Sequence, residues 1–562
     1  MKFICIVFLS FAVPQSFQPT EAERRAASLI TQDVLRAHTR FLASDLLEGR
    51  GPGSRGDSLA QAYILSQLQA LGLKPGARGG PEGGWLQPVP LVGVSTHQPR
   101  EAVFLRTGER VSLKQHDDFI VSAGAPRPQL AFQDAEIVFV GYGIQAPEHG
   151  WDDFKGADVR GKVLLVLNND PARDPRLFAG ETRLYYGRWD YKYEKAAEVG
   201  AAAALIIHTT PSAGYPWQVV QTSWSGEQFE LRSESARRLA AKGWLTEDAA
   251  RRVVLLAGKD LDQLRQAAEG RDFRPVPLGV RLSLELASTI RDVTSANVLG
   301  VLEGSDPELK HEAVLVTAHH DHLGMEEIGP GAKGGAGAVG VDRIYNGAVD
   351  NASGVAVLLA MARAFTALPA APSRSILFAA VAAEEQGLLG SAHLAAHPPF
   401  GAGHLAAIVN MDGINIWGRT RDVTFVGLGK SDLDLVVQAV AAWQGRVVKP
   451  DQFPDRGFFY RSDQFSLARI GVPGIYLDTG TDFIGRPAGW GKEQAEAWER
   501  EHYHQPSDEY SDSWDLSGAV EDAQLLFYAA LRVAQARAMP RWTPGDEFEA
   551  ARKAALEARG RP

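Results

Sequence analysis

Imidazole and carboxylate side chains recur in this chain where strand-like apolar runs end. The apolar run 313–317 leads directly into His319, and the run 376–381 leads into the pair Glu384-Glu385. A loop between the two runs supplies a further aspartate. Because sites in open α/β sheets are built at the carboxyl ends of strands, these side chains are expected to meet in space. The pattern predicts a metal site.

The length of the chain, 562 residues, exceeds one ordinary hydrophobic core, so we expect two domains or one domain with a large insertion. A hydrophobic content of 45% and a charged content of 22% are typical of a globular protein. The formal net charge of −10 argues against nucleic acid and anionic membranes as partners.

The first residues resemble the front of a secretory signal, with Lys2 followed by an apolar run over residues 3–13. Such a run is too short to span a bilayer, so no integral membrane protein is expected. We assign residues 1–16 to the signal and expect a secreted or periplasmic protein. Cys5, the single cysteine, lies inside this run, so a mature chain would have neither disulfides nor thiol catalysis.

The middle of the chain differs in texture from what precedes it. Residues 21–133 begin with two helical segments and are assigned to the N-terminal part of the main domain. Residues 134–290 contain several strand-like runs and no catalytic constellation, which predicts an inserted β-rich domain. His208 follows an apolar strand there and is interpreted as a core histidine.

From residue 291 to residue 540, strand-like and helix-like segments alternate. The strands are expected at 297–302, 313–317, 375–381, 406–410 and 475–477, and the helices at 353–368, 388–396, 433–443 and 518–538. This alternation predicts an α/β fold, a doubly wound and mostly parallel mixed sheet flanked by helices. Residues 541–562 are interpreted as a charged C-terminal tail.

Hydrolytic metal sites use imidazole nitrogen and carboxylate oxygen and leave a position for water. Two metals that share a bridging carboxylate need about five protein ligands, and a separate carboxylate must act as the base. The chain offers His319, Asp350, one of Glu384 and Glu385, Asp412, and a histidine of the segment 501–508. Each donor alone is weak evidence, but their joint occurrence at strand ends favours a two-metal centre.

These donors lie in motifs that resemble those of a known family. The motifs are His319-x-Asp321, Asn346-Gly347-Ala348-Val349-Asp350-Asn351-Ala352-Ser353-Gly354, Glu384-Glu385, Asn410-Met411-Asp412 and His504-x-x-x-Asp508. In this order they resemble the co-catalytic zinc aminopeptidases of the MH clan, relatives of bacterial leucyl aminopeptidase, glutamate carboxypeptidase II and the transferrin receptor. The resemblance covers about residues 298–533 and implies the zinc exopeptidase fold. The insert resembles a protease-associated domain.

The resemblance also implies roles for individual residues. His319 and Asp412 would be terminal ligands of one metal, Glu385 and His504 of the other, and Asp350 would bridge the pair. Glu384 would be the general base. Asp321 would hold the imidazole of His319 from behind, and the peptide bond after Asp350 would be cis. The implied cofactor is two zinc ions per chain, with manganese or cobalt able to use the same ligands.

Some residues depart from the family pattern or lie outside it. His320, His322 and His502 match no ligand position and are assigned packing or orienting roles. Val349 stands where many relatives have an aspartate. The common Arg-Ser-Asp-His occurs as Arg461-Ser462-Asp463-Gln464, and the preceding Tyr460 is either a phenol donor to the oxyanion or a packed aromatic.

The function implied is that of a secreted or periplasmic di-zinc exopeptidase, and an aminopeptidase is favoured. It would hydrolyse the N-terminal bond of peptide substrates by metal-activated water, with Glu384 as general base. A metallo-carboxypeptidase and a glutaminyl cyclase-type acyltransferase of the same fold are the alternatives. A non-catalytic binding protein like the transferrin receptor ranks last, because none of the ligands is lost.

Overall fold

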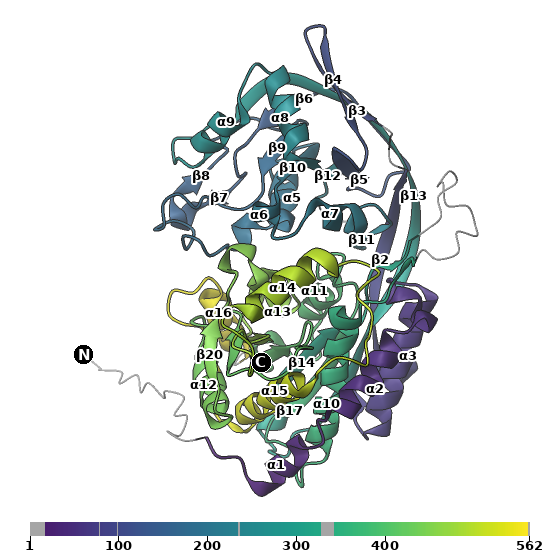
Figure 1. Ribbon diagram of the computed structural model, residues 1–562, viewed down its shortest axis with the longest axis vertical. Helices are drawn as coiled ribbons and strands as arrows, with labels where there is room; N and C mark the ends of the chain where they lie inside the picture. The colour runs from purple at the N-terminus through teal and green to yellow at the C-terminus, as the bar shows by residue number, and fades with distance from the viewer. Residues whose placement is uncertain are drawn as a thin grey trace.

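A mostly parallel sheet forms the centre of the lower lobe in the computed structural model (Figure 1), which describes residues 17–77, 79–97, 99, 101–233, 237–326 and 342–559. Its parallel strands lie side by side in the order β17, β14, β18 and β21, and β13 and β19 add antiparallel strands at the two sides. The bounds are β13 Val276–Leu302, β14 Ala313–His319, β17 Ser375–Val381, β18 Leu405–Asn410, β19 Asp422–Phe425 and β21 Gly474–Asp478. The expected signal at residues 1–16 lies outside the described residues.

Helices cover both faces of this sheet. Val314 and Val316 of β14 belong to the core that includes α10 (Gly354–Thr366) and α15 (Ser517–Gln535). Leu315, between them, belongs to the core on the other face, with residues of α11 (Leu389–Ala396) and α13 (Gln464–Arg469). Successive side chains of a strand point to opposite faces, so a strand that is buried on both faces is apolar throughout. The doubly wound α/β fold predicted from the sequence is therefore confirmed.

Helices from the N-terminus complete the lower lobe. The segments α1 (Glu21–Ala27), α2 (Gln32–Leu42) and α3 (Arg55–Ala70) contribute buried side chains to the same core as α10. The cap of α1 is a capping box, in which Thr20 and Glu23 each accept a hydrogen bond from the other's backbone N–H. Residues that precede the insert in sequence thus stabilise the sheet that follows it.

A second group of strands, continuous with the same sheet through β13, forms the centre of the upper lobe (Figure 1). It contains β6 (Gln129–Phe139), β9 (Val163–Leu167), β10 (Ala203–His208), β12 (Ala241–Thr246) and β5 (Phe119–Ala123), the first four parallel and β5 antiparallel. Helices α8 (Glu247–Leu256) and α9 (Leu261–Ala268) pack on one face, and α7 (Trp217–Ser223) packs on the other. The lobe is therefore mixed α/β. The sequence predicted a β-rich insert because β9 and β10, which are buried on both faces, appear in it as continuous apolar runs.

One strand joins the lobes. β13 runs without interruption for 27 residues, pairing with β6 in the upper lobe and with β17 in the lower lobe (Figure 1). β2 (Leu86–His97) pairs with it over most of the crossing. Residues 102–121, which precede the expected insert, already contribute side chains such as Phe104 to the upper core. The lobes are thus continuous through a shared ribbon of backbone hydrogen bonds.

The C-terminal segment folds back on the lower lobe. Trp542 and Phe548 are 4% and 7% exposed and pack with Phe459 and Phe465. Arg552, on α16 (Glu549–Arg559), is 2% exposed and donates hydrogen bonds to backbone carbonyls of residues 405, 406 and 540. The other charged residues of α16 are not buried, so its charged composition is that of a helix that packs against the lower lobe with one face.

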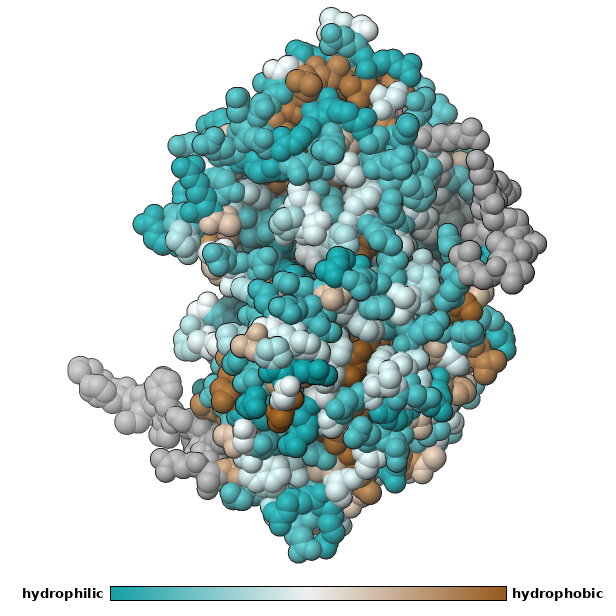
Figure 2. Space-filling view, viewed as in Figure 1, coloured by the Kyte–Doolittle hydropathy of each residue, from teal (hydrophilic) through white to brown (hydrophobic). Residues whose placement is uncertain are grey.

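The face shown in Figure 2 is predominantly hydrophilic, and its hydrophobic residues form separate patches. One described stretch, Ala348–Thr366, is long and apolar enough to cross a membrane by length and composition. However, 83% of it is buried inside the molecule, as in the core helix of a folded domain. It includes α10, the central helix of the lower lobe.

Candidate metal centre

The predicted donors gather at one edge of the lower sheet. His319 is the last residue of β14, Glu384 and Glu385 follow β17, and Asp412 follows β18. These three strands are parallel neighbours, so their carboxyl ends meet at the same edge. Asp350 reaches this edge from the turn before α10, and His504 reaches it from the segment after α14 (Trp490–Glu501).

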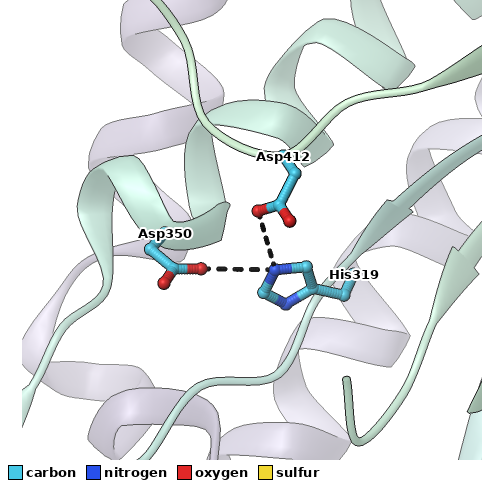
Figure 3. Close-up of side chains that lie close together, drawn as sticks. All are labelled: His319, Asp350 and Asp412. Carbon is cyan, nitrogen blue, oxygen red and sulfur yellow. Dashed lines mark hydrogen bonds and ion pairs between the residues drawn. The ribbon is translucent and has the colours of Figure 1, made fainter. Parts of the chain in front are cut away.

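The imidazole of His319 faces two aspartates (Figure 3). Its Nε2 lies 3.2 Å from Oδ1 of Asp350 and 3.2 Å from Oδ1 of Asp412. Oε2 of Glu384 is 4.0 Å from the same nitrogen. The side chain of His319 is only 1% exposed, so these carboxylates converge on a buried nitrogen.

Asp350 lies between the two histidines. Its Oδ1 faces His319, and its Oδ2 lies 3.3 Å from Nε2 of His504. The same Nε2 is 3.0 Å from Oε2 of Glu385. The peptide bond between Asp350 and Asn351 is cis, as the resemblance implied. One carboxylate therefore spans two groups of donors, His319 with Asp412 and His504 with Glu385.

The electrostatics of the cluster favour bound positive charge. Burial would lower the pKa of His504, but Glu385 and Asp350 outweigh it and raise that pKa to about 10. The pKa of His319 is likewise raised well above its usual value, against burial, by Glu384 and Asp412. A cluster that holds protons this strongly offers the imidazole and carboxylate donors, closely spaced, that a divalent metal needs. The residues present fit two ions.

Glu384 differs from its neighbour. Burial, reinforced by the carboxylates of Asp412 and Glu385, raises the pKa of Glu384 well above its usual value. The pKa of Glu385 is lowered to about 2 despite its burial and the charge of Asp350, because His504 and His322 favour the ionised form. Glu384 is therefore the carboxylate of the pair that takes up a proton readily, and Glu385 is the one that stays ionised.

Asp321 connects the histidine to the glutamate pair. Nδ1 of His319 lies 3.2 Å from the backbone oxygen of Asp321 and 3.8 Å from its Oδ1. The same carboxylate accepts hydrogen bonds from the backbone N–H of Glu384 at 3.0 Å and of Glu385 at 3.4 Å. Asp321 therefore orients donors on two different strands, which sequence spacing alone did not indicate.

Arg50 connects the loops that carry His319 and Asp350. Its guanidinium is fully buried and donates hydrogen bonds to four backbone carbonyls, those of residues 42, 320, 346 and 347. Two of these precede Asp350, and one follows His319. The Gly-rich segment after α2 thus supplies an arginine that fixes the spacing between two donor loops.

The motif neighbours of the donors have separate partners. His320 Nε2 lies 2.9 Å from Oδ1 of Asp57, away from the cluster. His322 Nδ1 is hydrogen-bonded to Oε1 of Glu385, so His322 orients a donor although it matches no ligand position. Its Nε2 is buried without a hydrogen-bond partner, and it forms a possible metal-holding group with Asp350 and Glu385. His502 is hydrogen-bonded to Ser507 near the surface.

The structure does not bring Tyr460 to the cluster. Its hydroxyl donates to Oε1 of Glu547 at 2.6 Å, and its ring packs among aromatic residues. The phenol beside the donors is Tyr503, whose ring stacks on that of His504 with 3.9 Å between centroids. The hydroxyl of Tyr503 accepts a hydrogen bond of 3.0 Å from Arg461. Tyr503 directly precedes His504 in the sequence, but its residue type did not distinguish it from Tyr460.

A cavity of about 200 Å³ opens beside the cluster. Asp350, Glu384 and Asp412 lie in its wall. The rest of the wall includes six aromatic residues, three further carboxylates and three cations; these are Trp417, Phe453, Phe458, Tyr476, Trp498, Tyr503, Asp451, Asp478, Glu499, Arg456, Arg461 and Lys492. Space for a ligand with an apolar or aromatic group therefore adjoins the donors.

Comparisons with known proteins agree with this geometry. The model of peptidase family M28 matches residues 297–528. An aminopeptidase of Bacillus subtilis, YwaD, is 36% identical over 260 residues, which are 45% of this chain and 40% of that protein. A "probable zinc metalloprotease" of Phaeosphaeria nodorum is 31% identical over 175 residues, covering 31% and 32% of the two chains. The matches thus span less than half the length of these curated relatives.

The likeness to solved structures extends along almost the whole chain. An aminopeptidase from Aneurinibacillus sp. strain AM-1 matches 92% of this chain and 97% of its own, with a TM-score of 0.53 and 19% sequence identity. At this identity the likeness concerns the fold alone. It covers both lobes, so the arrangement of an α/β lobe with a second, upstream lobe is shared with a solved protein.

Proposed function

We propose that the chain, whose residues 297–528 match the model of peptidase family M28, belongs to this family of co-catalytic zinc peptidases of the MH clan and is an exported di-zinc aminopeptidase. The observation that carries the proposal is the position of Asp350, whose two carboxylate oxygens face two different imidazoles. Asp350 would therefore be the ligand that two metal ions share.

The donors divide into two sets around that carboxylate. His319 and Asp412 would hold one zinc ion, and His504 and Glu385 the other, each sharing Asp350. Zinc is supported by the donor types and by the names of the relatives, and manganese or cobalt could use the same ligands. When bound, the ions would polarise the scissile carbonyl and make water a better nucleophile at neutral pH.

The residues of the chain then supply the proton transfer and the positioning. Glu384 lies in the cavity wall beside Asp350 and Asp412, where it can accept a proton from the attacking water and return it to the leaving amine. Its raised pKa suits that exchange. Asp321 holds the backbone of Glu384, and so fixes where the proton is taken up.

The substrate would be a peptide with a free amino terminus. The aromatic residues of the cavity suit an apolar first side chain. Its carboxylates Asp451, Asp478 and Glu499 offer partners for a cationic group, and the cations Arg456, Arg461 and Lys492 line the same wall. The upper lobe would be a protease-associated-type domain at the entrance of the site. Export is supported by the basic residue and apolar run at the start of the sequence.

Turnover on matched aminoacyl and N-blocked peptides tests the proposal, with metal content measured on the same preparation. We expect hydrolysis of the free-amine substrates only, and two zinc ions per active chain. Preferential cleavage of N-blocked peptides at the carboxyl end would favour a carboxypeptidase. Ring closure of N-terminal glutamine without hydrolysis would favour a glutaminyl cyclase-type enzyme.

A further inference from the structure

One hydrogen bond reaches the donor cluster from the upper lobe. The hydroxyl of Ser223, the last residue of α7, lies 2.8 Å from Nδ1 of His504. Among the described residues, the possible metal-holding groups contain no member from this lobe. Ser223 therefore contacts the donor cluster through His504 and is not itself a metal donor.

The geometry of His504 explains what this hydroxyl does. Because Nε2 faces Glu385 and Asp350, it is the nitrogen that would bind a metal. Nδ1 of a neutral imidazole then carries the proton and needs an acceptor. For His319 that acceptor is the backbone oxygen of Asp321, from the same loop. For His504 it is Ser223, which is 281 residues away in sequence.

Ser223 lies in a tightly packed part of the upper lobe. The side-chain amide of Gln228 donates a hydrogen bond of 3.1 Å to the backbone carbonyl of Ser223. The next residue, Trp224, packs edge-on against Trp189 and Trp244, with ring centroids 4.9 Å and 5.9 Å apart. Trp244 is fully buried. Packing of this kind fixes the direction in which the hydroxyl points.

Other contacts link the lobe to the same loops. Gln218, also on α7, donates from Nε2 to Oε1 of Gln505 at 3.0 Å, directly after His504. The backbone N–H of Phe229 donates to Oε1 of Gln386 at 3.1 Å, directly after Glu385. The residues that follow His504 and Glu385 are thus both held by hydrogen bonds from the segment 217–231.

We propose that Ser223 is a positioning residue through which the upper lobe orients His504 and sets the affinity of the metal position formed by His504 and Glu385. This rests on the proposed function, because it takes His504 to be a ligand. The upper lobe then does more than shape access to the cleft: it completes one of the two metal positions, and the other is complete within the lower lobe.

Ser223→Ala tests the proposal in the full chain. Loss of a partner that orients a ligand histidine typically weakens metal binding by about 10- to 100-fold. We expect this loss for one of the two zinc ions only, measured by competition with a chelator, with kcat falling as that ion is lost. Ser225→Ala is the matched control, because the buried hydroxyl of Ser225 has no hydrogen-bond partner among the residues that the structure describes. It should bind both ions like the wild type.

Ser223→Thr is the rescue variant, since it keeps the hydroxyl. A cavity of about 70 Å³ beside Ser223 gives room for the added methyl group. We expect Ser223→Thr to recover most of the affinity lost in Ser223→Ala. Equal zinc affinities in Ser223→Ala and the wild type, equal weakening of both ions, or no recovery in Ser223→Thr would each overturn the positioning role.

The wild type separates this proposal from the one on which it rests. If wild-type chain binds two zinc ions and cleaves aminoacyl substrates, the proposed function stands whatever Ser223→Ala does. If the active wild type holds fewer than two zinc ions, the proposed di-zinc function is wrong. This outcome is measured on the wild type alone and does not depend on any variant.

Discussion

The carboxylate of Asp508 accepts a hydrogen bond of 3.1 Å from the backbone N–H of Asp350, the residue that faces both imidazoles. Its other oxygen accepts from the backbone N–H of Val349 at 2.9 Å. Asp508 is only 1% exposed, so no water competes for these bonds. The turn that carries Asp350 is therefore held in place by a side chain from the C-terminal end of the motif His504-x-x-x-Asp508.

Replacing Asp508 with alanine should lower both stability and metal affinity. Two buried N–H groups would lose their acceptor, at about 1–3 kcal/mol each, and the turn of Asp350 would be free to shift. Chemical denaturation with and without zinc measures both effects. Asp512→Ala is the matched control, because Asp512 is exposed and pairs only at the surface with Arg40 and Tyr510. If Asp508→Ala lost no more stability and metal affinity than Asp512→Ala, other contacts would hold the turn of Asp350.

Removing the metals should inactivate the enzyme and destabilise the lower lobe. The donors place several carboxylates within 3–4 Å of buried nitrogens, as the Asp350 and Glu384 contacts of His319 show, and bound zinc stabilises such a cluster. Zinc at 100 times its dissociation constant would add about 2.7 kcal/mol per site. Elemental analysis should find two ions per active chain. Full activity with one ion, or with none after dialysis against a strong chelator, would contradict the two-metal centre.

His208 should make the upper lobe sensitive to acid. Burial lowers its pKa to about 4 from an ordinary 6.5, and its Nε2 is 3.1 Å from the backbone oxygen of Tyr215. The unfolded chain therefore binds a proton that the folded chain excludes. Stability is full above pH 6.5 and is lost as the pH falls toward 4, by about 3 kcal/mol in all.

His208→Phe should remove this dependence, because phenylalanine suits the surrounding Trp217 and Trp244 rings and does not titrate. The measurement is the difference in unfolding free energy between wild type and variant at neutral pH and near pH 4. Since the imidazole lies outside the donor cluster, kcat on a small chromogenic substrate should stay nearly unchanged at neutral pH. A large loss of kcat in a folded variant would mean that the upper lobe carries part of the chemistry.

The sequence was most informative where strand and site coincide. His319 could be predicted because β14 is a continuous apolar run, which marks a strand buried on both faces, and the residue at its carboxyl end reaches the edge where α/β sites form. The same argument located Asp412 after β18. The lower sheet and the donor cluster were therefore visible from local patterns.

Contacts between lobes left no such pattern. Ser223 is an ordinary serine in a polar segment, and its relation to His504 exists only because β13 and β2 carry the chain between lobes. Tyr460 and Tyr503 were also indistinguishable by type, since which phenol faces the cavity depends on how the segments 458–460 and 490–501 pack. Tertiary packing, rather than propensity or spacing, decides these positions.

Tyr503→Phe should lower kcat while Tyr460→Phe should not. The Tyr503 hydroxyl lies in the cavity wall and accepts from Arg461, so its own proton is free to be donated to the substrate. Loss of one hydrogen-bond donor to a developing oxyanion typically costs about 100- to 1,000-fold in kcat. The hydroxyl of Tyr460 is bonded to Glu547 instead, so its loss should affect stability only. Equal kcat values in the two variants would remove Tyr503 from the chemistry.

The final prediction distinguishes Glu384 from Glu385. Oε2 of Glu385 lies 3.0 Å from Nε2 of His504, so Glu385→Ala should remove a donor and weaken metal binding. Oε2 of Glu384 lies 4.0 Å from Nε2 of His319, and the residue lines the cavity. Glu384→Gln should therefore keep the fold and both metals and lose only the proton acceptor.

Because general acid–base catalysis is typically worth about 100- to 10,000-fold, kcat of Glu384→Gln should fall by that order while substrate binding persists. Metal content by elemental analysis and single-turnover kinetics on one preparation separate the two effects. The isosteric glutamine is chosen because it keeps the size of the side chain and removes the ionisable carboxylate. Metal loss in Glu384→Gln with retention in Glu385→Ala would exchange the two roles. Near-normal turnover in Glu384→Gln would mean that another group accepts the proton from water.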